Sequence, residues 1–268
     1  MTLVTLLGIL IGAIMGLTGA GGGILAVPVL VAGMHWSMQQ AAPVALVAVA
    51  MGAGVGAIDG FRYRLVRYKA AILMAISGIP VTRLGQYWAH QLPQFLLIGS
   101  FALLMLMVSM RFYKESKQKQ LAPAQDALRL VEVSSETGKF IWTPLTAFVL
   151  TSIGMLTGLM TGLLGVGGGF LIVPLMKRFT HLTLPGIVAT SLFVITMVGS
   201  GGVVNALLSG AELPIVETSL FVSSMVCGML LGRPLVHRLQ AWQVQRGFAL
   251  LLFCVSVYML VKAILIFE

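Results

Sequence analysis

The stretch GLTGAGGGILAVP at residues 16–28 returns as GLLGVGGGFLIVP at residues 162–174. Each copy joins a cluster of glycines to a short apolar run that ends in a proline. The same displacement along the chain, which we call the repeat offset, takes Gly16 to Gly162 and Asp59 to Asn205. Self-similarity over this length predicts an internal duplication, which is a common feature of transporter folds.

The composition predicts that the chain is embedded in a lipid bilayer. Of the 268 residues, 58% are hydrophobic and 9% are charged, and the mean hydropathy is +1.00. A soluble domain carries about 25% charged residues, because water must solvate its surface. Apolar runs of about 20 residues, long enough to span a bilayer core of about 30 Å, recur along the chain. No basic residue precedes Arg62, so we interpret the apolar N-terminus as a first membrane segment and not as a cleaved signal peptide.

Each half of the chain contains five apolar segments. The second segment of each half is too short to cross a bilayer, because a helix rises only about 1.5 Å per residue. We therefore expect the first two segments to form a hairpin or broken helix near the midplane, with the glycines at its bend. The predicted fold is an all-α polytopic membrane protein with a first repeat (residues 1–110), a linker (111–139) and a second repeat (140–268). The expected segments are residues 2–18, 23–34, 38–59, 70–87 and 94–110, then 140–163, 168–177, 184–208, 214–232 and 246–266.

The basic residues predict the orientation of the repeats. If each hairpin enters and leaves on one side, the repeats are inverted, and 15 of the 17 Lys and Arg residues share a side with the linker. If each glycine cluster instead lies within a single crossing, the repeats are parallel and basic residues fall on both sides. The excess of positive charge on cytoplasmic loops favours the inverted arrangement, with a cytoplasmic linker and both termini outside.

A nucleotide-binding loop does not fit the glycine clusters. A dinucleotide fold needs an acidic residue about 20 positions after its loop, but no Asp or Glu lies between Gly23 and Asp59 or between Gly169 and Glu212. A Walker loop needs a Lys followed by Ser or Thr, which neither copy contains.

In a membrane, consecutive glycines break a helix, and the freed peptide groups are tolerated only beside protein or a water-filled cavity. We expect a short helix to begin after each cluster, at Ile24 and at Phe170, with its N-terminus near the bilayer centre. Free N–H groups and about half a positive charge at such ends favour an anion. The alternative is that glycines only permit close helix packing, which we favour for those spaced four apart: Gly8, Gly12, Gly16, Gly154, Gly158 and Gly162.

The paired motif GLTGAGGG and GLLGVGGG, each followed by Pro28 or Pro174, resembles the TauE/SafE family of membrane permeases, the sulfite exporter family. The segment VATSLFVI at residues 188–195 is similar to that family's second-half signature. The resemblance spans nearly the whole chain and implies transport of a sulfur-containing anion such as sulfite, a sulfonate or thiosulfate. The first half departs from the pattern, because APVALVAV at residues 42–49 lacks the Thr–Ser pair.

Polar groups within apolar segments are costly, so each is a binding candidate, although lone hydroxyls often donate to the carbonyl four residues back. For Asp59 we expect an ion pair with Arg62 or Arg64. Arg83 and Arg233 each follow a glycine by five residues, and they either anchor at the interface or attract the anion at opposite faces. The candidate substrate-binding residues are Thr18, Gly19, Gly21, Gly22, Gly23, Gly165, Gly167, Gly168, Gly169, Thr190, Ser191, Asn205, Arg83 and Arg233.

The predicted function is a secondary transporter. An anion channel that uses the glycine hairpins as its filter is the alternative. A membrane-embedded enzyme is disfavoured, because the apolar segments hold no cluster of His, Asp or Glu. We expect no catalytic residue, metal, cofactor or nucleic-acid partner. The expected partners are the small anion and the lipid bilayer of a bacterial cytoplasmic (inner) membrane. The sequence leaves open whether the chain also forms a homodimer or binds a partner subunit.

Overall fold

The computed structural model describes residues 2–118, 140, 142–180, 182–211, 213–233 and 241–267, and within them it contains helices and no strand. The first half consists of α1 (Thr2–Thr18), the 3-10 helix η1 (Gly19–Leu25), α2 (Ala26–Gly33), α3 (Met38–Arg62), α4 (Tyr68–Gln91) and α5 (Gln94–Gln118). The second half consists of α6 (Pro144–Leu164), α7 (Gly169–Phe179), α8 (Leu184–Leu208), α9 (Ile215–Gly232) and α10 (Ala241–Phe267). α5 continues into the stretch expected as a linker, and residues 119–139 of that linker lie outside the described residues.

The outside of this bundle is apolar. Six of the described helices, α3, α5, α6, α8, α9 and α10, are long and apolar enough to cross a membrane. Large hydrophobic side chains point outward from them, and Phe148 is 71% exposed and Leu231 64% exposed. An apolar surface of this extent is typical of contact with lipid. The expected all-α polytopic membrane fold is confirmed.

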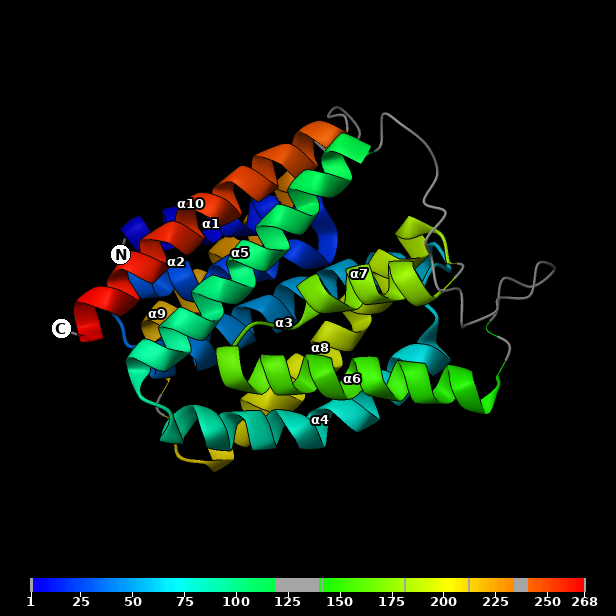
Figure 1. Cartoon of the computed structure of the whole chain (residues 1–268), viewed down its shortest axis with the longest axis horizontal. Helices are drawn as coiled ribbons and strands as arrows, with labels where there is room; N and C mark the ends of the chain where they lie inside the picture. The colour runs from blue at the N-terminus through cyan, green and yellow to red at the C-terminus, as the bar shows by residue number, and fades with distance from the viewer. Residues whose placement is uncertain are drawn as a thin grey trace.

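The main helix contacts join one half of the chain to the other. α1 packs on α9, α4 on α6, α3 on α8 and α5 on α10 (Figure 1). The repeat offset takes α1 to α6 and α4 to α9. The pair of α1 with α9 is therefore the counterpart of the pair of α6 with α4. α3 and α5 each pack on their own counterpart. The pairing therefore repeats the duplication that is visible in the sequence.

The two counterpart pairs are held together by glycines spaced four apart. On α1, a Cβ atom added to Gly12 would touch the carbonyl oxygen of Met225 on α9 and lie 2.8 Å from the backbone nitrogen of Met229. On α6, a Cβ added to Gly158 would lie 2.8 Å from the Cα of Gly78 on α4. Only glycine allows two helix backbones to approach this closely. The interpretation of these glycines as packing residues is confirmed.

Each half begins with a helical hairpin, and the two hairpins open toward opposite ends of the molecule (Figure 1). α1 starts at the end that holds both termini, and Gly33 at the end of α2 lies beside Leu3 near the start of α1. α6 starts at the opposite end, and α7 runs back toward that end.

The bend of the second hairpin follows the expectation. Gly165 (φ +70°) ends α6 and Gly168 (φ +62°) precedes α7, both in the left-handed backbone conformation that residues with a side chain rarely adopt. α7 begins at Gly169, one residue before the expected Phe170.

The bend of the first hairpin differs from the expectation. Gly19 (φ +73°) turns the chain, but residues 19–25 then form the 3-10 helix η1, and α2 begins at Ala26 and not at Ile24. A 3-10 helix bonds each N–H to the carbonyl three residues back, so it uses peptide groups that we expected to be free.

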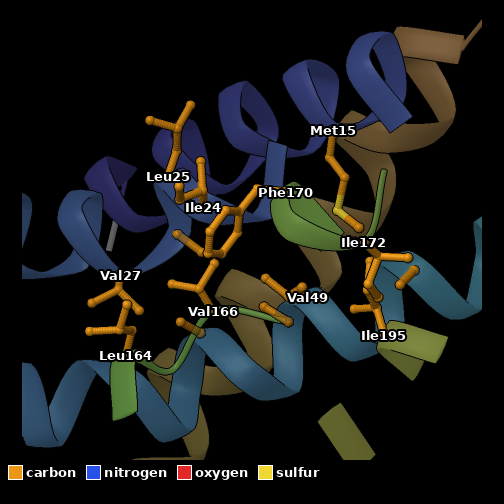
Figure 2. Close-up of a cluster of buried hydrophobic side chains, with 14 of the residues drawn as sticks. Met15, Ile24, Leu25, Val27, Val49, Leu164, Val166, Phe170, Ile172 and Ile195 are labelled. Atoms are coloured by element: carbon orange, nitrogen blue, oxygen red, sulfur yellow. The ribbon is translucent and has the colours of Figure 1, made fainter. Parts of the chain in front are cut away.

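Apolar side chains fill the space between the two bends (Figure 2). Phe170 lies beside Ile24, its counterpart at the repeat offset, and the two are 2% and 0% exposed. Val49 and Ile195 form a second buried counterpart pair close by. This central apolar cluster comprises Met15, Ile24, Leu25, Val27, Val49, Leu164, Val166, Phe170, Ile172 and Ile195. The middle of the bundle is therefore packed hydrocarbon.

Candidate functional site

A cavity of about 360 Å³ lies against both hairpin bends, and we call it the glycine cavity. Both glycine clusters contribute to its wall, and α5, α8 and α10 complete it. Its lining residues are Gly16, Leu17, Thr18, Gly19, Gly21, Arg111, Phe112, Gly169, Phe170, Val173, Pro174, Lys177, Leu184, Pro185, Val188, Val244, Gln245 and Phe248.

The polar groups of the glycine cavity suit a negative charge. Gly169 and Phe170, the first two residues of α7, line it, while the N–H groups of Leu171 and Ile172 bond to the carbonyl of Gly168 at 3.0 and 3.2 Å. The first N–H groups of a helix have no partner within the helix, and the helix dipole places partial positive charge there. Two basic side chains line the same cavity, and none of its described lining residues is acidic; the two are Arg111 and Lys177.

The structure brings four of the predicted site residues to this cavity: Thr18, Gly19, Gly21 and Gly169. The other glycines of the two clusters are buried against neighbouring chain. A Cβ added to Gly23 would lie 2.9 Å from Val49, and one added to Gly167 would lie 2.8 Å from the same side chain. A Cβ added to Gly22 would meet the backbone of Met15. The remaining two of these buried glycines are Gly165 and Gly168.

Three predicted polar residues of α8 lie away from the glycine cavity. Thr190 is fully buried, donates to the carbonyl of Gly186 at 2.7 Å, and accepts from the backbone N–H of Arg67 at 3.0 Å. Ser191 donates to the carbonyl of Val188 at 2.8 Å. Asn205 is half-buried near the end of the helix. The Thr–Ser pair thus bonds to backbone, and Thr190 fixes the loop between α3 and α4.

The ion pair of Asp59 is not the one expected from the sequence. Asp59 on α3 pairs with Arg233 at the end of α9, and not with Arg62 or Arg64. Neighbours in sequence were the natural partners, but packing across the two halves brings Arg233 closer. A guanidinium nitrogen of Arg233 also donates to the carbonyl of Gly56 at 3.2 Å.

Arg83 and Arg233 are not structural counterparts. Arg83 is exposed on α4, whereas Arg233 is half-buried between the two halves of the chain. Gln86 makes the contact that corresponds to the one between Arg233 and Gly56. The amide of Gln86 donates at 2.8 Å to the carbonyl of Gly202, and Gly202 is the counterpart of Gly56 at the repeat offset. The equal spacing of the two arginines from a preceding glycine was therefore a coincidence of sequence.

Replacing Arg233 by glutamine is expected to lower the free energy of unfolding by up to about 1 kcal/mol, because the Asp59 side chain is 44% exposed and its attraction to Arg233 is screened. Arg83→Gln should leave it unchanged. Thermal unfolding in detergent at low and high salt measures both, and Asp59→Asn added to Arg233→Gln should cost nothing further. A larger loss for Arg83→Gln would contradict this assignment.

The aromatic wall of the glycine cavity was not predicted from the sequence. Phe112 of α5 and Phe248 of α10 contact each other edge to face with ring centroids 5.4 Å apart, and both line the cavity. A second cavity of about 390 Å³ continues between α1 and α10 and shares four lining residues with the glycine cavity: Leu17, Thr18, Val244 and Phe248. No local motif marks these residues, because α5 and α10 read simply as apolar helices.

A smaller hollow of about 50 Å³ lies at the corresponding place in the other half of the molecule. Five of its lining residues are counterparts, at the repeat offset, of residues that line the glycine cavity. They are Met38, Gln39, Ala42, Gly162 and Leu163, which correspond to Leu184, Pro185, Val188, Gly16 and Leu17. The two halves thus form equivalent hollows of unequal size.

Comparison with known proteins gives a consistent result. The sequence model of the family described as "Sulfite exporter TauE/SafE" matches residues 4–259. A "Probable membrane transporter protein" of Xylella fastidiosa (strain Temecula1) is 29% identical over 262 residues, covering 94% of this chain and 91% of the relative. "Probable membrane transporter protein YunE" of Bacillus subtilis is 25% identical over 215 residues, covering 78% of each chain. No solved structure matches.

Proposed function

We propose a transport function for this chain, which belongs to the TauE/SafE family of membrane transporters. The chain is a secondary transporter that moves a small sulfur-containing anion across the cytoplasmic membrane of a bacterium. Sulfite, a sulfonate or thiosulfate is the expected class of substrate. The glycine cavity is the proposed binding site, and the chemistry is transport and not catalysis.

The observation that supports this site is the meeting of both hairpin bends at one cavity. Gly169 and Phe170 at the N-terminus of α7 line the cavity, and Gly19 and Gly21 of η1 line it as well. Backbone donors at a helix N-terminus bind an oxyanion without a formal charge. Lys177 and Arg111 in the wall add a positive potential that attracts it.

We propose further that the two halves are inverted repeats that exchange access to the two sides of the membrane. The opposite hairpin directions and the counterpart helix pairs support this arrangement. The described basic residues near the start of α4 and the ends of α3, α5, α7 and α9 lie at the end away from the termini, which supports a cytoplasmic linker. The large glycine cavity and its small counterpart then correspond to one open and one closed vestibule.

The central apolar cluster favours a transporter over the alternative of a channel. A channel filter needs a continuous polar path, whereas the space between the two bends is filled by buried side chains such as Phe170 and Ile24. Carriers open their two vestibules in turn, and an apolar barrier between them prevents a leak.

Gly21→Leu is the direct test of the glycine cavity. A Cβ at Gly21 would lie 3.4 Å from the ring of Phe248, an ordinary contact, so the fold should tolerate the change while the larger side chain fills the anion space. We expect anion binding to weaken by about 10- to 100-fold, the equivalent of one lost charge-assisted hydrogen bond. Binding of sulfite, thiosulfate, sulfonates and sulfate is measured in nanodiscs, and uptake in proteoliposomes.

The matched control is Gly99→Leu, because a Cβ at Gly99 would have nothing within 4 Å. Both variants should purify as single species with similar unfolding temperatures. Equal anion binding by Gly21→Leu and Gly99→Leu would show that the anion binds elsewhere.

A further inference from the structure

Two threonines of α6 have fully buried hydroxyl groups without a hydrogen-bond partner. Thr157 and Thr161 are both 0% exposed, and neither Oγ1 atom has a partner among the described residues. A helical threonine can normally donate to the carbonyl four residues back. Five others in the described part of the chain do so, at 2.7–3.0 Å, namely Thr18, Thr82, Thr180, Thr190 and Thr196, whereas Thr218 of α9 is a third buried threonine without a partner. Burying an unpaired hydroxyl is unfavourable, and two such hydroxyls one turn apart on the same helix suggest a missing ligand.

The internal duplication shows that packing does not require these hydroxyls. The counterparts of Thr157 and Thr161 in the first half are Ile11 and Met15, which are also 0% exposed. The first half therefore fills the same positions with hydrocarbon and a thioether, without a hydroxyl. In the second half, hydroxyl groups occupy these positions at two adjacent turns of one helix face.

Both threonines lie beside the bend of the second hairpin, and the hydroxyl of Thr161 faces it. A Cβ added to the left-handed Gly168 would meet the methyl group of Thr157 first, and it would lie 3.1 Å from Oγ1 of Thr161 and 3.1 Å from the carbonyl oxygen of Thr157. α6 ends here: the N–H of Gly165 donates to the carbonyl of Thr161 at 3.0 Å. The carbonyl groups of the last turn beyond Thr161 lack partners within the helix and carry its partial negative charge. The Thr161 hydroxyl therefore lies at the negatively polarised end of α6, one helical turn from Thr157 and next to the N-terminus of α7.

Neutral oxygen atoms at a helix C-terminus suit a monovalent cation. Divalent ions bind at sites that include carboxylates, and no group of three or more His, Cys, Asp or Glu side chains that could hold a metal exists in the described part of the chain. Half-helix ends and carbonyls at a broken helix are a common means of holding Na⁺ in transporters.

We propose that Thr157, Thr161 and the carbonyl groups at the end of α6 bind Na⁺, and that this ion couples to the transported anion. The coupling rests on the proposed function, because the anion would lie at Gly169, on the other side of the same bend. The positive ion offsets the charge of the anion, so each ion lowers the desolvation penalty of the other. Na⁺ binding and anion binding should therefore strengthen each other reciprocally.

The test separates the cation site from the anion site by omitting the anion. The thermal unfolding midpoint of the detergent-purified full chain is measured in NaCl and in choline chloride of equal ionic strength. Saturating Na⁺ should raise the midpoint of the wild type by about 3–8 °C, as expected for a ligand that binds only the folded state. Thr161→Val and Thr157→Val should abolish this shift, and in choline each variant should be at least as stable as the wild type, because an unpaired hydroxyl is gone.

Two controls support the assignment. Thr82→Val removes a buried hydroxyl that already donates to the carbonyl of Gly78, so it should keep the Na⁺ shift. Thr161→Ser retains the oxygen atom and should also keep it. Two results would overturn the proposal and leave a bound water as the partner of the hydroxyls. One is a wild type whose unfolding midpoint is the same in Na⁺ and in choline, and the other is a pair of valine variants that keep the Na⁺ shift. A Na⁺ shift without any anion transport would instead overturn the proposed function alone.

Discussion

Replacing Gly12 by leucine is expected to separate α1 from α9 and to lower the free energy of unfolding by about 3 kcal/mol. The first added carbon would already meet the carbonyl of Met225 and lie 2.8 Å from the nitrogen of Met229. Both contacts are backbone, so no change of side-chain rotamer can relieve them. The unfolding temperature and the fraction of monodisperse protein in size-exclusion chromatography measure the effect.

Gly158→Leu should produce a loss of similar size, because Gly158 lies against the backbone of α4 in the counterpart pair. Gly99→Leu is the control, since a Cβ at Gly99 faces open space and the residue adds only lipid-facing surface. If Gly12→Leu and Gly99→Leu unfold at the same temperature, the helix pairs are not held by glycine contacts.

Phe170→Ala is expected to have the second large effect, because Phe170 is at once a core residue and part of the barrier between the two hairpin bends. It is 2% exposed and lies beside Ile24. Truncating a buried phenylalanine removes about 3–5 kcal/mol of stability. The space left behind extends the glycine cavity into the central apolar cluster, so the anion should leak down its own gradient. Downhill flux from proteoliposomes without any coupling gradient is the measurement.

Phe148→Ala is the matched control, because Phe148 is 71% exposed on the lipid-facing side of α6 and borders neither bend. It should change neither stability nor leak appreciably. A wild type that already conducts anions at channel-like rates, with Phe170→Ala no faster, would support the channel alternative.

Much of the fold could be predicted from the sequence. The repeat offset predicted the correspondence of helices, and the segment expected at 184–208 has the bounds of α8. The shortness of the second segment in each half predicted the hairpins. The four-residue spacing of Gly8, Gly12 and Gly16 predicted helix packing. These properties depend on the length, periodicity and composition of continuous stretches, and neighbours in the chain determine them.

The candidate site could be predicted only in part. Both glycine clusters do reach one cavity, but Gly22 and Gly23 are buried in packing contacts while Phe112 and Phe248 complete the wall. The start of α2 was misplaced because the peptide groups after Gly19 form a 3-10 helix in place of a free helix end.

The sequence by itself determined a membrane protein of two related halves, a family, and the position of each bend along the chain. Only the tertiary structure decided which residues meet: Arg233 with Asp59, α10 with α5, and Thr157 and Thr161 with the bend at Gly168. Local patterns specify helices and turns through short-range sterics and hydrophobic periodicity. A cavity or ion pair instead depends on which helix surfaces lie side by side after the two halves pack, and that depends on contacts between residues far apart in the chain, such as Arg233 with Gly56.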